Sequence, residues 1–249
     1  MTATEKSAIA ANFERIKERI RLAADRAGRR AEDVTVVAVS KTFPFQAIRA
    51  AYDAGLRHFG ENRVQEWESK QPRVADLDAT WHLIGHLQGN KARRAAGLFS
   101  RVDSVDGLAI AQKLDFAFAA DRTSENDEVK AEDRGNRLQV LIEVRLSDEA
   151  SKSGAVELDL GSLAEGVADL DHLRLLGLMT IPPFLDDPER VRPYFSKLRE
   201  LRDDLAQRLG RPLPVLSMGM SHDFDVAIEE GATEIRIGTA LFGERAAKA

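Results

Sequence analysis

Short runs rich in apolar and β-branched residues recur along the chain, and segments with helical spacing separate them. The spacing predicts eight strands, at residues 34–41, 58–62, 81–85, 101–105, 138–146, 175–181, 215–220 and 234–238. Strand and helix in strict alternation are typical of a parallel sheet. Eight such units in 249 residues favour a closed (β/α)8 TIM barrel of the α/β class. An open doubly wound sheet stays as the alternative, although it usually has fewer strands for this length.

Two segments differ from the repeating unit. Ile9, Phe13, Ile16 and Ile20 recur at three- and four-residue steps, which predicts an extra N-terminal helix that Gly28 ends. Residues 119–137 hold ten charged residues and almost nothing to bury, so we expect a mobile loop there. We expect residues 1–249 to form a single domain.

Composition excludes several classes of function. The net charge of −5 argues against a long basic surface for nucleic acid or membrane binding. Without any cysteine, the chain has no disulfides, thiolate nucleophiles or Cys-ligated metal centres. His82 and His86 are four residues apart but fall on a strand and a turn, so we predict no metal site. No stretch looks like a secretory signal or a membrane span, which favours a cytoplasmic protein.

A lysine at the end of the first predicted strand is the strongest chemical signal. Val37, Val39 and Lys41 share one face of this strand, so the amine lies where an apolar interior begins. Partial burial lowers the pKa of a lysine and yields the free amine that attacks an aldehyde to form a Schiff base. The alternative is a lysine that extends into solvent from the strand end.

The turns after the seventh and eighth strands are small and rich in hydroxyl groups. The seventh strand runs into residues 217–223, which include Ser217, Gly219 and Ser221, and the eighth runs into residues 236–239, which include Gly238 and Thr239. Glycine lets backbone N–H groups approach a ligand, and Ser221 and Thr239 can open the following helices, whose N-termini favour anions. In TIM barrels these loops often bind phosphate. The alternative is a pair of ordinary strand–helix turns.

Barrel closure would make the first and last strands neighbours, so Lys41 and the two turns would face one ligand. That ligand would carry an aldehyde and a phosphate, as does pyridoxal 5′-phosphate or a sugar phosphate in a Schiff-base aldolase. Arg236 shares a face with Glu234 and Gly238 and would reach the same ligand. If it faces a pyridine nitrogen, it keeps the ring a weak electron sink, because guanidinium does not give up its proton. The alternative is an ion pair with Glu234 or a helix carboxylate.

Seven ordered blocks of sequence resemble one known family. They are AVSKT (38–42), FGENRVQE (59–66), WHLIGHLQGNK (81–91), SKSG (151–154), GLMTIP (177–182), SMGMSHDF (217–224) and IRIGTALFG (235–243). From about residue 5 to 245 the chain is similar to the YggS/PROSC family, the pyridoxal phosphate homeostasis proteins. The resemblance implies a barrel like the N-terminal domain of alanine racemase, with pyridoxal phosphate held as an aldimine on Lys41.

The resemblance also implies roles for individual residues. Ser221, Gly238 and Thr239 would hold the phosphate, Arg236 would face the ring nitrogen, and Asn62 and Met179 would line the ring pocket. Lys152 would be a second, transient acceptor of the cofactor. Arg145 departs from the family pattern, which more often has a small amide there, and the charged 121–137 segment is longer than expected.

Three functions remain open at this stage. The favoured one is a non-catalytic protein that stores pyridoxal phosphate and delivers it to apo enzymes. A second is an amino-acid racemase, which would need a second proton-transfer group; Tyr52 and Tyr194 fall on predicted helices, and no added β domain fits after the last strand. The third is a sugar-phosphate aldolase that uses Lys41 without a cofactor. We expect a monomer whose partners are pyridoxal phosphate and apo enzymes.

Overall fold

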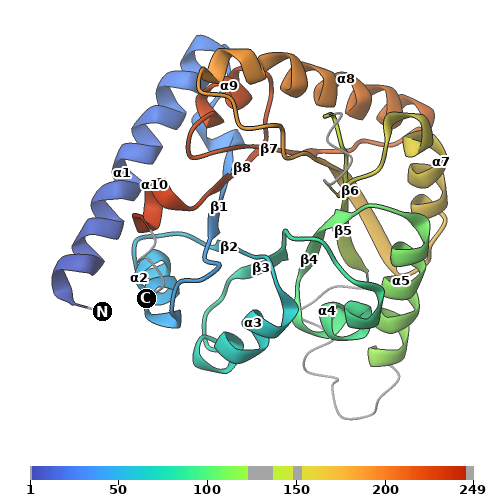
Figure 1. Cartoon of the computed structure of the whole chain (residues 1–249), viewed down its shortest axis with the longest axis horizontal. Coiled ribbons are helices and arrows are strands. Elements are labelled where there is room, and N and C mark those ends of the chain that lie inside the picture. Colours follow the sequence, from blue (N-terminus) through green and yellow to red (C-terminus); the bar gives the residue numbers. More distant parts are fainter. Residues whose placement is uncertain (1, 123–136, 148–152, 245–249) are drawn as a thin grey trace.

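The computed structural model describes residues 2–122, 137–147 and 153–244, and in it the eight strands close into a barrel. All neighbouring strands are parallel, and β8 pairs with β1 to complete the ring (Figure 1). The strands are β1 (Thr35–Val39), β2 (His58–Glu61), β3 (Thr80–Leu83), β4 (Arg101–Val105), β5 (Leu138–Glu143), β6 (Leu173–Met179), β7 (Val215–Met220) and β8 (Glu234–Ile237). The predicted closed barrel is confirmed, and the open sheet is wrong.

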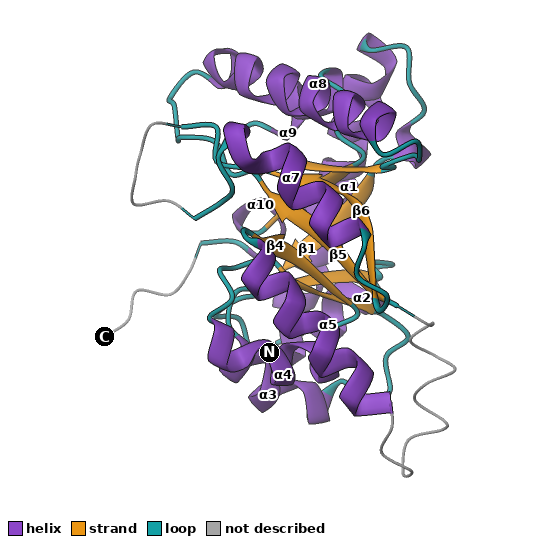
Figure 2. Ribbon diagram, turned by 90° about the vertical axis from the view of Figure 1, so that its right-hand side faces the viewer, coloured by secondary structure: helices purple, strands orange, loops and turns teal. Residues whose placement is uncertain are grey.

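Helices surround this barrel, and a side view shows them outside the layer of strands (Figure 2). They are α1 (Ala3–Arg26), α2 (Phe45–Asp53), α3 (Val64–Lys70), α4 (Ala92–Leu98), α5 (Leu108–Arg122), α7 (Glu157–Ala168), α8 (Arg192–Arg208), α9 (Phe224–Glu229) and α10 (Thr239–Phe242). In the described part of the chain, short 3-10 helices lie in connections: η1 (Ala31–Asp33), η2 (Gln71–Arg73), η3 (Gly89–Lys91) and η4 (Pro188–Val191). Among the described residues, no helix combines the length and apolar character that crossing a membrane requires.

The predicted N-terminal helix is confirmed as α1. Thr2 and Glu5 form a capping box at its start, and Gly28 adopts the left-handed conformation (φ 64°) just after its end. The helix packs against α9, α10 and α2, and Arg29 beyond it donates to the carbonyl oxygens of Ile228 and Ala232. The first helix of the chain therefore covers the seam where β1 meets β8.

The predicted loop at 119–137 begins too early in the chain. Residues 119–122 continue α5, which ends at Arg122, because Ala117 and Phe118 are still buried on its inner face. The rest of the prediction, at 123–136, lies outside the described residues.

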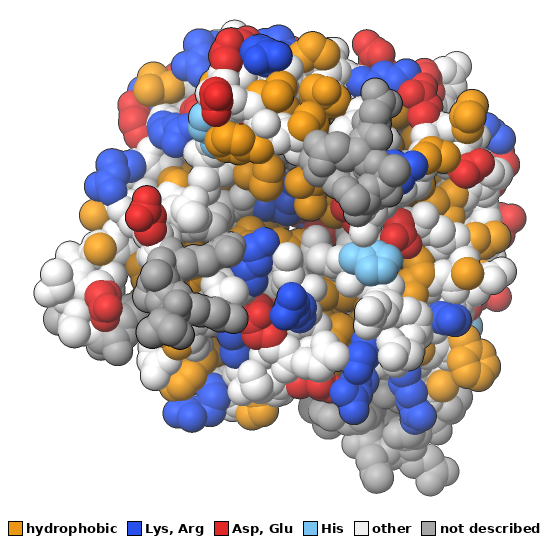
Figure 3. Space-filling model, in the orientation of Figure 1, with side chains coloured by type: hydrophobic (Ala, Val, Ile, Leu, Met, Phe, Trp, Pro, Cys, Tyr) orange, Lys and Arg blue, Asp and Glu red, His pale blue; other side chains and the backbone are white. Residues whose placement is uncertain are grey.

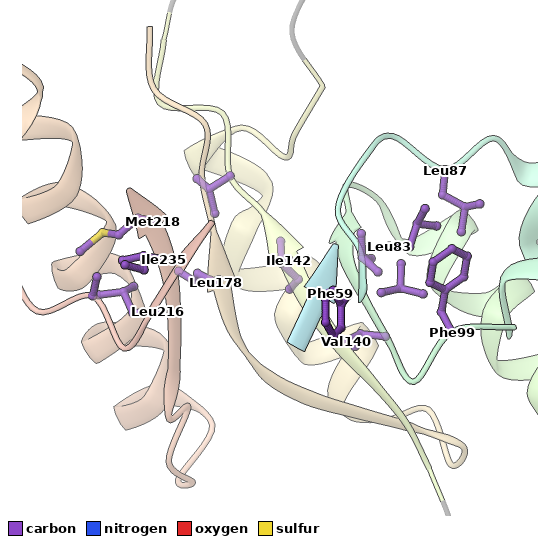
Figure 4. Packing of buried hydrophobic residues seen from close by; sticks show 14 of the residues in the cluster. Phe59, Leu83, Leu87, Phe99, Val140, Ile142, Leu178, Leu216, Met218 and Ile235 are labelled. Atoms are coloured by element: carbon purple, nitrogen blue, oxygen red, sulfur yellow. The ribbon is translucent and has the colours of Figure 1, made fainter. Parts of the chain in front are cut away.

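The main hydrophobic core lies between the barrel wall and the helices. Outward-facing side chains of the strands supply much of it, including Phe59, Leu83, Ile142, Leu216 and Ile235 (Figure 4). The residues that alternate with these along each strand point into the barrel, where their side chains pack against one another. Alternation along the strands therefore separates an apolar outer layer from an interior that carries the polar and charged groups.

Candidate functional site

A cavity of about 500 Å³ opens at the carboxyl ends of the strands. The turns after β1, β2, β3, β7 and β8 and the end of β5 line it. In the space-filling view, basic and acidic side chains lie around a depression near the middle of the face (Figure 3). This is the end of a TIM barrel at which active sites are found.

The turn after β1 places Lys41 in the wall of this cavity. Strand β1 ends at Val39, and Thr42 has the left-handed conformation (φ 69°), which is uncommon for a residue other than glycine. The carboxylate of Glu66 accepts the backbone N–H of Thr42, and this contact holds the strained turn. Lys41 is thus presented by a fixed turn, on the same side as Val39, as predicted.

A buried ion-pair network supports the turn from behind. The ammonium of Lys70 donates to the carbonyl oxygen of Ser40 (3.0 Å), to Glu61 (2.9 Å) and to Glu66 (2.6 Å). Burial raises the pKa of Glu61, while Lys70 opposes that rise. The hydroxyl of Ser40 also donates to Glu61 at 2.7 Å. The backbone on both sides of Lys41 is therefore tied to one cluster.

Arg236 enters the cavity from β8 and is held by two neutral acceptors. Its guanidinium donates to Ser217 Oγ at 2.8 Å and to the carbonyl oxygen of Thr180 at 2.7 Å. The alternative of an ion pair with Glu234 is wrong, because Glu234 instead binds Arg101. Burial lowers the pKa of Arg236, which is 3% exposed, and surrounding carboxylates oppose the shift. A fixed cationic side chain therefore faces any ligand bound here.

The turns after β7 and β8 meet at one corner of the cavity. Ser221 does not open the next helix: its Oγ accepts the N–H of Ala240 at 3.2 Å, in the first turn of α10. Gly238 precedes α10, and an added Cβ there would meet nothing closer than 3.7 Å. Thr239 begins α10, as predicted. The corner combines two hydroxyl groups with an open stretch of backbone, a donor set suited to a phosphate.

Not every predicted site residue reaches the cavity. Those that line it are Lys41, Asn62, Ser221, Arg236, Gly238 and Thr239. Ser217 is buried one layer below and anchors Arg236. Gly219 (φ 92°) faces α9, where a Cβ would lie 2.6 Å from that of Ala227, so it serves helix packing. Met179 packs with Leu141 and Leu176 inside the barrel.

The sequence reasoning missed Glu143, the last residue of β5. This side chain lines the cavity although it is 6% exposed, and its buried Oε2 has no hydrogen-bond partner in the described structure. Burial raises the pKa of Glu143 to about 7, while Arg236 opposes the rise. The signal was a charged residue closing an apolar strand, the same signal that revealed Lys41.

A second polar cluster lies deeper in the barrel. Ligand-type atoms of His82, Asp103 and Glu234 lie within 4.8 Å of one another, as in a metal site. The guanidinium of Arg101, however, binds both Asp103 and Glu234 and takes the place a cation would occupy. His86 bonds Asp106 at the cavity rim instead, so the two histidines four residues apart do not share a ligand.

Comparison with known proteins places the chain in a family. A family model described as the N-terminal domain of alanine racemase matches residues 7–246. The chain belongs to the alanine racemase N-terminal domain family. In this family, the pyridoxal phosphate homeostasis protein of Pseudomonas aeruginosa is 48% identical over 239 residues, covering 96% of each chain. Its counterpart in Aquifex aeolicus is 47% identical over 231 residues, 93% of this chain and 96% of the relative.

A solved structure in the same family agrees with the fold. PipY of Synechococcus elongatus, whose structure has PLP bound, is 39% identical to this chain with a TM-score of 0.76. The match covers 92% of this chain and all of PipY (100%). These findings confirm the resemblance to the pyridoxal phosphate homeostasis proteins that the seven sequence blocks indicated.

Proposed function

We propose that this protein binds pyridoxal 5′-phosphate and acts in its homeostasis, holding the cofactor on Lys41 and delivering it to other enzymes. One observation carries the proposal: an amine and a phosphate-type donor set line the same cavity. The names of the relatives and the PLP-bound PipY structure support this reading.

The residues present fit the cofactor. Lys41 would bond covalently to its aldehyde, and Ser221, Gly238 and Thr239 would hold its phosphate. Arg236 would face the ring nitrogen, and Asn62 would line the ring. When bound, the cofactor supplies an electrophilic carbonyl and a conjugated ring able to accept electrons. Met179, Ser217 and Gly219 act behind these residues, in packing and in orienting Arg236.

The cavity is poorly equipped for racemisation. Arg236 keeps its proton, so it does not turn the ring into a strong electron sink. Tyr52 and Tyr194, the two tyrosines of the chain, lie on α2 and α8 and do not line the cavity. A two-base racemase needs a second proton-transfer group on the opposite face of the ring. The arrangement therefore favours storage and delivery over turnover.

Borohydride reduction followed by peptide mass analysis tests the covalent site. We expect the protein to be yellow after addition of pyridoxal phosphate and the reduced adduct to map to Lys41. Lys41→Ala should lose the adduct and keep its fold, because the change removes an amine at the cavity wall and leaves the core volume intact. A colourless, unreactive protein would contradict cofactor binding and leave the sugar-phosphate aldolase as the function.

Delivery and catalysis are separated by two assays on the same loaded protein. One incubates it with racemisable amino acids, and the other with an apo transaminase. We expect the transaminase to gain activity and the amino acids to keep their configuration. Sustained racemisation that Lys41→Ala abolishes would identify an enzyme instead.

Some sequence predictions stay predictions. Lys152 lies outside the described residues, so its role as a transient acceptor rests on the family resemblance. The cytoplasmic location, the monomeric state and the identity of the recipient apo enzymes also stay predictions. We propose that residues 1–249 form a single domain.

A further inference from the structure

Glu143 faces the cavity from the side of the barrel opposite Lys41. In a closed ring of eight strands, β5 is four strands from β1 in either direction. Lys41 follows β1, Glu143 ends β5, and both side chains line the same cavity. A ligand bound to Lys41 would thus lie between the amine and this carboxylate.

One oxygen of the buried Glu143 carboxylate lacks a hydrogen-bond donor among the described residues. Its Oε2 is buried without a hydrogen bond within the described structure, a situation that costs free energy unless a ligand supplies a donor. Asp223, the other buried carboxylate of the cavity, instead accepts the N–H of Met220 at 2.6 Å. Glu143 is therefore the acidic group open to a donor from a ligand.

The charges around Glu143 limit what that ligand group can be. Burial raises the pKa of Glu143 to about 7. Arg236 and His86 oppose this rise, and Asp106 adds to it. Both protonation states are thus populated near neutral pH. A primary ammonium group fits, because it brings positive charge and N–H donors.

We infer that Glu143 accepts the proton of a primary ammonium group that enters the cavity to take the bound carbonyl carbon from Lys41. This inference rests on the proposed delivery function and names the substrate class of the release step. An amine is the chemical group that can exchange with a lysine at a carbonyl carbon.

The exchange balances without any oxidant or reductant. The incoming ammonium gives one proton to the Glu143 carboxylate, and its freed electron pair forms a new bond to the carbonyl carbon. A second proton passes from the incoming nitrogen to Lys41 Nζ. The bonds between the carbon and Nζ then break as a double bond forms from the carbon to the incoming nitrogen. Lys41 leaves as a neutral amine, which takes up the proton held by Glu143. The carbon has exchanged one nitrogen for another.

Two amines with different protonation distinguish this role. Glycine carries an ammonium group at neutral pH and must lose a proton, whereas methoxyamine is already unprotonated. We expect Glu143→Gln to slow release of the cofactor to glycine by about 100-fold, the usual scale of general base catalysis, and to leave release to methoxyamine within about twofold. Stopped-flow absorbance of the loaded protein measures both rates, and Asp223→Asn is the matched control that should keep their ratio unchanged.

A second readout uses the cofactor-free protein. Infrared difference titration detects the carboxylic acid band that Glu143→Gln removes. We expect ethylammonium chloride to lower the pH at which this band disappears, relative to sodium chloride at equal ionic strength, because the cation stabilises the ionised form. An unchanged titration overturns the inference.

The outcomes separate this inference from the proposed function. If the wild-type protein forms no adduct on Lys41, the proposed function fails. If the adduct forms but Glu143→Gln slows both amines equally or neither, only the role of Glu143 fails. The same selective loss in Asp223→Asn would also overturn it, because a general effect of cavity charge would then explain the result.

Discussion

At the scale of single residues, the burial of Glu143 makes stability depend on pH. Its pKa rises from 4.5 to about 7 in the folded protein. Between these pH values the folded state binds more protons than the unfolded state, so the free energy of unfolding falls as pH rises through this window. We expect Glu143→Gln to stabilise the protein at pH 8 by about 1–3 kcal/mol, measured by urea unfolding.

The gain should disappear below pH 4.5, where both states of the wild-type protein hold the proton. Glu165→Gln, at an exposed carboxylate that pairs with Arg208, is the control and should change stability by less than about 0.5 kcal/mol. Equal stability of Glu143→Gln and the wild type at pH 8 would show that the carboxylate has a solvated environment.

At the scale of elements, the turn between β1 and α2 depends on a residue from another helix. Lys70 is the last residue of α3, yet its ammonium binds Ser40 and Glu61 next to that turn. We expect Lys70→Met to cost about 3–5 kcal/mol of unfolding free energy, because it leaves the Glu61 carboxylate buried without a cation. It should also slow adduct formation on Lys41, measured by absorbance, because the strained turn loses its support.

A surface lysine serves as the comparison for this variant. Lys17 pairs with Glu14 on the exposed face of α1, so Lys17→Met should cost less than about 1 kcal/mol and leave adduct formation unchanged. Similar losses in the two variants would mean that the cluster behind Lys41 has no special role.

At the scale of the whole molecule, the deep polar cluster joins strands from different parts of the chain. His58 of β2 lies 3.0 Å from His82 of β3, which bonds Asp103 of β4. Arg101 continues the chain of contacts from Asp103 to Glu234 on β8. Burial alone would raise the pKa of Asp103, but Arg101 and His82 hold it below its usual range. These contacts link β2, β3 and β4 to β8 through the barrel interior.

This cluster predicts sensitivity to acid. Burial, with a smaller effect of His82, lowers the pKa of His58 from 6.5 to about 4. The unfolded state therefore binds more protons between these values, and stability is lost as pH falls through 6.5 towards 4. We expect His58→Gln to reduce that loss by up to about 3 kcal/mol, measured as the difference in unfolding free energy from the wild type across this range. If the unfolding free energies of His58→Gln and the wild type changed in parallel with pH, this prediction would be wrong.

The alternation of strands and helices was readable from local pattern, because apolar periodicity depends on residues that are neighbours in sequence. It predicted the closed barrel, and strand ends that agree to within a few residues. The end of the first strand likewise indicated Lys41, because a charge that closes an apolar strand marks the edge of the interior. The seven blocks identified the family for the same reason, since they are contiguous.

What local pattern could not decide is which side chains face the cavity. Strict alternation predicts that Ser217 and Gly219 share a face, but the positive φ of Gly219 and a register shift in β7 turn it toward α9. The partner of Arg236 and the isolation of Glu143 depend on strands that are distant in sequence. Only barrel closure brings those groups together, and burial then sets their charge, because desolvation depends on every surrounding element and no single segment encodes it.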